Sequence, residues 1–164
     1  MIGMLRSARE SQAWDNVVNC ADDLLNSNAN LSSEIEQEII LSRAIANAKK
    51  GKTIAAQADL ATLASNTQSE AGAQAAYELA KMQFEEDDLE EAEQTLDNLI
   101  DSATPHHYWL AKGFILLCDI YHKNGNVQDA IETLRSVKEN YPGREGDIFN
   151  EIDSRLSKWS KKGK

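Results

Sequence analysis

The stretch FILLCDIYHKNGNVQDAIETLRSVKENYP, residues 114–142, decides the expected fold of this chain. Apolar residues recur every three or four positions on both sides of a central Asn-Gly-Asn, which is the period of an α-helix. Gly125 can close a tight turn with a positive φ, and Pro142 cannot continue a helix. The stretch therefore predicts two helices joined by a short turn.

The same pattern of helix, tight turn and helix occurs twice more, earlier in the chain. The turns centre on Gly51, Asp87 and Gly125, which are 36 and 38 residues apart. An alanine follows each centre after five residues, a large aliphatic residue four later and another three later. In the three copies these are Ala56, Leu60 and Leu63, then Ala92, Leu96 and Leu99, then Ala130, Leu134 and Val137. A register shared by three copies indicates an internal repeat.

The third copy has the most specific order of residue types. Its key positions are Phe114, Leu117, Cys118, Tyr121, Ala130, Leu134 and Pro142. This order resembles the tetratricopeptide repeat. The resemblance implies an all-α fold, an α-α superhelix of antiparallel helix pairs. The first copy departs from the family pattern, because Arg43 and Asn47 stand where leucine and tyrosine are expected, and the second has Gln83 in the tyrosine position.

We expect a single domain over residues 1–164 that ends in a capping helix, because Ile148, Ile152 and Trp159 lie on one helical face. At the other end, Met1 and Met4 give the first helix an apolar side that nothing in the sequence covers. This suggests a fragment of a longer repeat protein, with terminal helices that could self-associate. The expected units are a partial or divergent repeat at 1–30, repeats at 31–68, 69–105 and 106–142, and the capping helix at 145–160.

Composition narrows the classes of partner. The formal net charge of −10 argues against nucleic acid, since binding to phosphates needs lysine and arginine. No apolar run is long enough for this segment to insert into a membrane. The acidic run at 85–93 is read as a solvated turn.

The sequence offers little for catalysis, metals or cofactors. His106 and His107 are adjacent and therefore point to different sides, and Thr104 with Pro105 makes them part of a loop at a helix start. Cys118 precedes His122 by four residues, but the repeat places Cys118 at a buried position. Cys20 is isolated. We expect no enzyme, no cofactor and no metal site.

The expected function is a non-catalytic scaffold that binds a protein or peptide in the concave groove lined by the first helix of each pair. The candidate groove contacts are Leu41, Ile45, Tyr77, Lys81, Phe84, Ile115, Asp119 and His122, with Glu38, Ala48, Gln74 and Lys112 beside them. Leu41, Tyr77 and Ile115 form one apolar column. The column either contacts a partner or packs against neighbouring helices, in which case the chain is a structural or self-associating segment.

Two stretches are similar to bacterial tetratricopeptide proteins of the cell envelope, most of all those of Bacteroides-like organisms. They are LAKMQFEED at residues 79–87 and WLAKGFILLCDIYHKNGN at residues 109–126. This resemblance implies a place on the periplasmic side of a bacterial envelope, while a cytoplasmic location stays open.

Overall fold

The computed structural model describes residues 1–27 and 29–161. Over those ranges the backbone forms nine α-helices and no strand, which confirms the all-α prediction. The helices are α1 (Ile2–Glu10), α2 (Trp14–Asn26), α3 (Ser33–Lys49), α4 (Thr53–Ala64), α5 (Glu70–Glu85), α6 (Leu89–Asp101), α7 (His107–Lys123), α8 (Val127–Asn140) and α9 (Gly146–Ser160).

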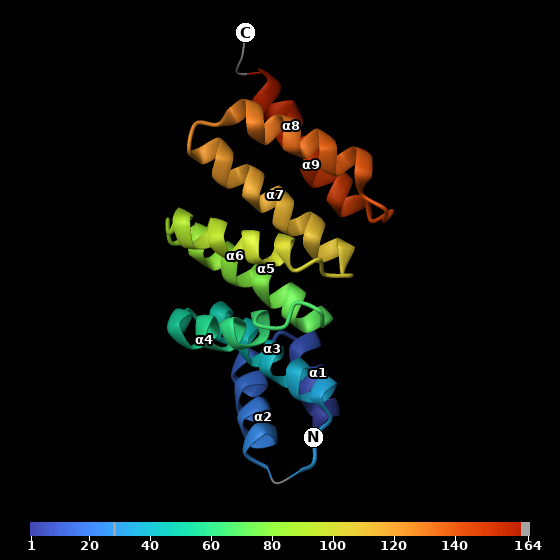
Figure 1. Cartoon of the computed structure of the whole chain (residues 1–164). Coiled ribbons are helices and arrows are strands. Elements are labelled where there is room, and N and C mark those ends of the chain that lie inside the picture. Colours follow the sequence, from blue (N-terminus) through green and yellow to red (C-terminus); the bar gives the residue numbers. More distant parts are fainter. Residues whose placement is uncertain (28, 162–164) are drawn as a thin grey trace.

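The helices form antiparallel pairs that stack in chain order, with the two ends of the chain at opposite ends of the stack (Figure 1). Each helix contacts the next helix, and the first helices of successive pairs also contact one another. Within the described part of the chain, no helix contacts a helix more than two places away. This nearest-neighbour packing confirms the predicted superhelix of helix pairs.

Four turns share one backbone geometry. Gln12, Gly51, Asp87 and Gly125 have positive φ values of 56°, 71°, 70° and 87°. In each case the next residue's amide donates to the carbonyl five residues before it, with N···O distances of 2.8–2.9 Å. This bond belongs to the Schellman type of helix end. Gln12 lies 39 residues before Gly51 and so extends the turn register to the partial or divergent repeat expected at residues 1–30, whose turn the sequence pattern did not locate.

We predict that Gln12→Gly stabilises the fold by about 1 kcal/mol, because glycine adopts positive φ without the Cβ clash that other residues meet. Urea unfolding followed by circular dichroism measures the change. The converse variant, Gly51→Gln, should lose a similar amount, since a Cβ at Gly51 meets nothing within 4 Å and only the backbone conformation is strained. Equal stability of Gln12→Gly and the wild type would contradict this account.

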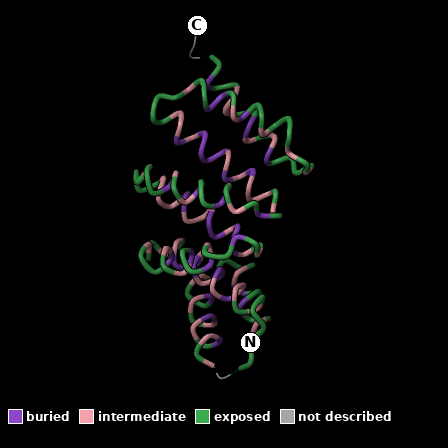
Figure 2. The backbone as a smooth tube through the Cα atoms, viewed as in Figure 1, coloured by how far each residue is buried: buried purple, intermediate pink, exposed green. Residues whose placement is uncertain are grey.

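The residues at the repeated positions form the core. The alanines five residues after the turns, Ala56, Ala92 and Ala130, are fully buried, and so is Cys118. Small side chains at these positions let the helices approach closely, and leucines fill the space beside the contact. Figure 2 shows buried residues along the middle of the stack and exposed residues at the turns. The capping helix α9 buries Ile148, Ile152 and Trp159, as its spacing predicts.

The closest backbone approach involves Gly72 at the start of α5. A Cβ at this position would lie 1.9 Å from the carbonyl oxygen of Asn66, so the loop before α5 requires glycine here. A Cβ at Gly113 of α7 would instead meet the side chain of Leu99 at 3.1 Å, which can shift. The two glycines therefore differ in what their replacement displaces.

We predict that Gly72→Ala destabilises the protein by about 3 kcal/mol, because relieving the clash requires a backbone shift. Gly113→Ala is the matched control and should cost about 1 kcal/mol or less, since a leucine side chain can rotate away. Chemical unfolding of both variants gives the comparison. A smaller loss for Gly72→Ala than for Gly113→Ala would show that the loop before α5 adapts freely.

Arg43, which replaces the leucine of the family pattern, joins three helices. Its guanidinium donates to both carboxylate oxygens of Asp59 on α4 and to one of Asp22 on α2, each at 2.8 Å. The bonds with Asp59 raise the pKa of Arg43 above its ordinary value. The side chain of Asp59 is only 15% exposed, so its charge depends on this partner.

We predict that Arg43→Leu destabilises the fold by about 2 kcal/mol, because it leaves the carboxylate of Asp59 largely buried and without its cation. Lys138→Leu removes an exposed ion pair with Asp153 and should change stability by less than about 0.5 kcal/mol. Thermal unfolding of both variants tests the difference. A higher stability of Arg43→Leu than of the wild type would show that the ion pairs of Arg43 are dispensable.

Candidate functional site

The first helices α1, α3, α5, α7 and α9 lie side by side and form one face of the stack, here termed the first-helix face. All eight candidate groove residues are on α3, α5 or α7. Their surroundings differ, however, and most of them bond or pack against a neighbouring first helix.

The apolar column is largely internal. Leu41 is 5% exposed and Ile115 is 1% exposed, so neither side chain presents a surface to a partner. Tyr77 is half-buried, with its ring 5.8 Å from that of Trp109 and its pKa raised to about 12 by burial. Of the two readings that the sequence left open, packing against neighbouring helices therefore holds for Leu41 and Ile115. Spacing identified their face but not the helices that cover it.

The other apolar candidates are also partly enclosed. Ile45 is half-buried and packs against the cluster that contains Leu41. Phe84 is half-buried, and the ammonium group of Lys123 lies 5.1 Å from the centre of its ring. Lys81 is exposed. Among the eight candidates, Lys81 is thus the one whose side chain is open to solvent.

The candidates on α7 bond to α9. Asp119 accepts two bonds of 2.7 Å from the guanidinium of Arg155. His122 stacks on Trp159 with 4.4 Å between ring centroids. These contacts hold α9 against α7, and they occupy the carboxylate of Asp119 and one face of the His122 ring.

Bridges between side chains join most neighbouring first helices. Arg6 on α1 holds Glu38 on α3 through two bonds of 2.7 Å. Between α5 and α7, the ammonium group of Lys112 lies 5.2 Å from the ring centre of Tyr77. Lys112 also pairs with an acidic residue of α9. Between α3 and α5, no side-chain hydrogen bond or ion pair occurs among the residues that the structure describes.

A hollow of about 470 Å³ opens at this unbridged step, and we term it the α3/α5 hollow. Its lining consists of Glu34, Gln37, Glu38, Leu41, Gln68, Ser69, Glu70, Ala71, Gln74 and His106. Ala71 supplies apolar surface, and the half-buried amide of Gln74 supplies donors and an acceptor. The amide of Gln37 donates a 3.1 Å bond to the hydroxyl of Ser33. The exposed carboxylates of Glu34 and Glu70 add negative charge. This mixture suits the backbone and polar side chains of a polypeptide.

The rim of the hollow is fixed by bonds between two loops. Thr104 donates a 2.6 Å bond to the carbonyl of Thr67, and Gln68 donates a 2.8 Å bond to the carbonyl of Ser102. A ring nitrogen of His106 lies 3.0 Å from the carbonyl oxygen of Gln68. Thr104 and Pro105 lie in a loop at a helix start, as expected, because α7 begins at His107. Thr104 does not cap α7 and instead ties the two loops together.

N-cap serines satisfy one backbone donor at the start of each of the helices α3 and α5. Ser32 accepts a bond from the amide of Ile35, and Ser69 accepts one from the amide of Gly72, so both helix starts are capped. Of the lining residues, the sequence pattern had placed Glu38, Leu41 and Gln74 among those that face the groove, and all three lie on first helices.

Three further features of the described residues concern a buried thiol, metal binding and membrane spanning. Burial raises the pKa of the Cys118 thiol to about 12, which keeps it protonated. No cluster of three histidine, cysteine, aspartate or glutamate side chains is arranged for a metal ion over residues 1–27 and 29–161. Over the same ranges, no helix is both long and apolar enough to cross a bilayer.

The stacked pairs and their shared turns agree with the comparison to known families. A family model described as a tetratricopeptide repeat-like domain matches residues 6–155. The chain belongs to this family. No curated protein and no solved structure matches the chain. Tetratricopeptide repeat-like domains are generally non-catalytic scaffolds used for protein interaction, and the match includes the N-terminal pair that the sequence pattern treated as partial or divergent.

Proposed function

We propose that this protein is a non-catalytic scaffold that binds a short segment of a partner protein in the α3/α5 hollow. The observation that carries the proposal is the absence, among the described residues, of any side-chain hydrogen bond, ion pair or ring contact between α3 and α5. At this step a hollow opens that is lined by the amide of Gln74 and the exposed carboxylates of Glu34 and Glu70. Its volume lies within the range of about 300–1,000 Å³ that is common for binding pockets.

Binding of a partner costs free energy wherever it must displace contacts within the protein. At the α1/α3 and α7/α9 steps, a partner would have to displace ion pairs or a stacked ring. At the α5/α7 step it would have to displace the ammonium group of Lys112 from the ring of Tyr77. In the α3/α5 hollow, the amide of Gln74 can exchange water for a partner without breaking a bond within the protein. The amide of Gln37 would instead give up its 3.1 Å bond to the hydroxyl of Ser33. The fixed loops at the rim reduce the ordering that binding requires.

The apolar column of Leu41, Tyr77 and Ile115 is not part of this proposal. Because Leu41 and Ile115 are buried, recognition depends on polar groups around a small apolar floor. Lys81, on the same face, is an exposed side chain that a longer segment would reach.

Affinity capture from the source organism, followed by quantitative mass spectrometry, tests this function. Gln74→Trp fills the hollow and should reduce recovery of the partner at least about tenfold, a loss of roughly 1.4 kcal/mol. Gln94→Trp on the outer side of α6 is the matched control and should recover the partner as the wild type does. Equal recovery with both variants would exclude the hollow as the binding site.

A second role, as a segment that packs onto another repeat, is favoured by α1. Met1 and Met4 are 68% and 65% exposed, which leaves the outer side of α1 able to pack on a further helix pair. Within this proposal the chain is part of a longer repeat protein. The resemblance to bacterial envelope proteins supports a periplasmic location, and protease accessibility in intact and osmotically opened cells would test it.

A further inference from the structure

The outer side of α4 differs from that of every other second helix. Its exposed side chains, Ile54, Ala55, Ala58, Ala61 and Thr62, carry no charge. The only charged residue of α4 is Asp59, which Arg43 holds on the inner side. The outer sides of α2, α6 and α8 instead carry exposed acidic residues; these are Asp15 and Asp23 on α2, Glu90, Glu91, Asp97 and Asp101 on α6, and Asp129, Glu132 and Glu139 on α8.

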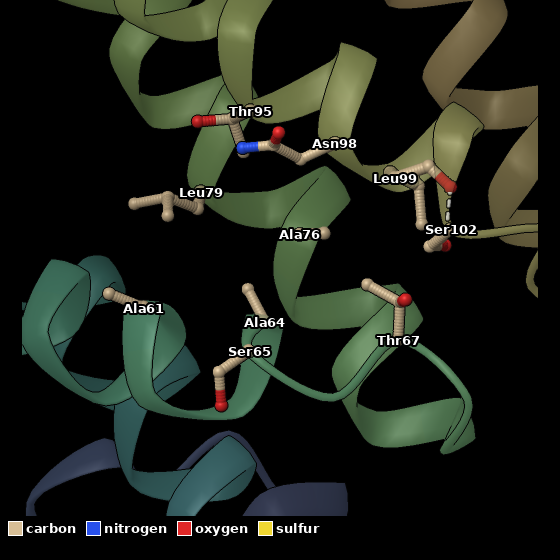
Figure 3. Close-up of a pocket in the computed structure, with 10 residues that line it drawn as sticks. All are labelled: Ala61, Ala64, Ser65, Thr67, Ala76, Leu79, Thr95, Asn98, Leu99 and Ser102. Atoms are coloured by element: carbon tan, nitrogen blue, oxygen red, sulfur yellow. Dashed lines mark hydrogen bonds between the residues drawn. The ribbon is translucent and has the colours of Figure 1, made fainter.

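A second hollow of about 430 Å³ lies beside this uncharged side, between α4 and α6 (Figure 3). Figure 3 shows Ala61 and Ser65 on one wall, Thr95 and Asn98 on the opposite wall, and Leu79 between them. None of its lining residues is charged; they are Ala61, Ala64, Ser65, Thr67, Ala76, Leu79, Thr95, Asn98, Leu99 and Ser102. We term it the α4/α6 hollow. It shares no residue with the α3/α5 hollow.

A projecting apolar side chain lies on α4, which forms one wall of the α4/α6 hollow. Ile54 is 85% exposed, the highest value among the large apolar side chains of the described residues. It precedes Ala61 by seven residues, or about 10 Å along the helix at 1.5 Å per residue. Two helical turns place Ile54 and Ala61 on the same side of α4. The surface therefore carries both an apolar projection and an uncharged recess.

We propose that two copies of this protein associate through α4, with the two α4 helices antiparallel about a two-fold axis beside Ala58. This axis brings Ile54 of each copy opposite residues 61–65 of the other, where it enters the α4/α6 hollow. One surface then supplies both halves of the contact, as an isologous interface requires. The small side chains of Ala55 and Ala58 let the helix axes approach closely.

Charge explains why the second copy meets this side and not another. Each chain has a formal net charge of −10, so two copies repel each other wherever acidic faces meet. Along the second helices, α4 is the one whose exposed residues in the described structure carry no acidic group. Contact at α4 thus removes apolar surface from water, and the helix at the centre of the contact carries no exposed acidic group. The α3/α5 hollow stays free in each copy.

Sedimentation equilibrium of the whole chain tests the proposal. The wild type should reach twice the 18.2 kDa mass of one chain as concentration rises. Ile54→Glu should raise the dissociation constant roughly a hundredfold, because two buried isoleucines are lost per dimer. Its circular dichroism spectrum should stay unchanged, since residue 54 is exposed in the single chain. Met4→Glu on α1, another exposed apolar residue, is the matched control and should still dimerise.

Chemical cross-linking tests the position of the two-fold axis. Ala58→Cys in a Cys20→Ser background should form dimers with a short bis-maleimide, because a residue beside the axis meets its own copy. Glu132→Cys on α8 is the control and should not do so. The buried thiol of Cys118 stays unreactive in both. A wild type that remains monomeric up to about 1 mM, a dimer abolished by Met4→Glu but not by Ile54→Glu, or equal cross-linking of the two cysteine variants would overturn the proposal.

Discussion

The architecture depends on one backbone hydrogen bond, repeated at four turns. In each turn a residue with positive φ reverses the chain, and the following amide bonds to a carbonyl five residues earlier. The bond ends the first helix and aims the second one back along it. Small residues at Ala56, Ala92 and Ala130 can then meet the first helices closely, and the leucines beside them form the core. Since this geometry returns every 36 to 39 residues, the pairs stack in one direction.

Stacking brings the first helices into one row, and their side chains then decide where a partner can bind. Arg6, Lys112 and Arg155 reach across to neighbouring helices and satisfy carboxylates there. Such pairs fix the spacing of the helices and also remove those groups from recognition. Among the described residues, the α3/α5 step has no hydrogen bond, ion pair or ring contact between side chains of its two helices, so the amide of Gln74 stays available. On the side formed by the second helices, α4 lacks the exposed acidic residues of α2, α6 and α8, so a second acidic chain meets less repulsion there.

Much of the fold could be predicted from local signals, whereas the site could not. Gly51 and Gly125 mark turns because glycine tolerates positive φ, and the alanine register follows from close packing. Gln12 gives no such signal, so the fourth turn emerged only from the backbone. Spacing correctly placed Leu41 and Ile115 on first helices, but burial depends on neighbouring helices that no local pattern specifies. The α3/α5 hollow depends on a missing bridge, and only the packed structure reveals a missing contact.

The contact of each helix with only its nearest neighbours has a consequence for how the molecule opens. In such an array, unfolding free energy is a sum of pair stabilities and interfaces, and opening can start at one pair and spread along the stack. The bonds of Arg43 couple α2, α3 and α4 into one cooperative unit. Amide protons of these helices will therefore exchange with solvent together, while those of the end helices exchange through separate, smaller openings. Local motion at one end leaves the opposite end of the stack in place.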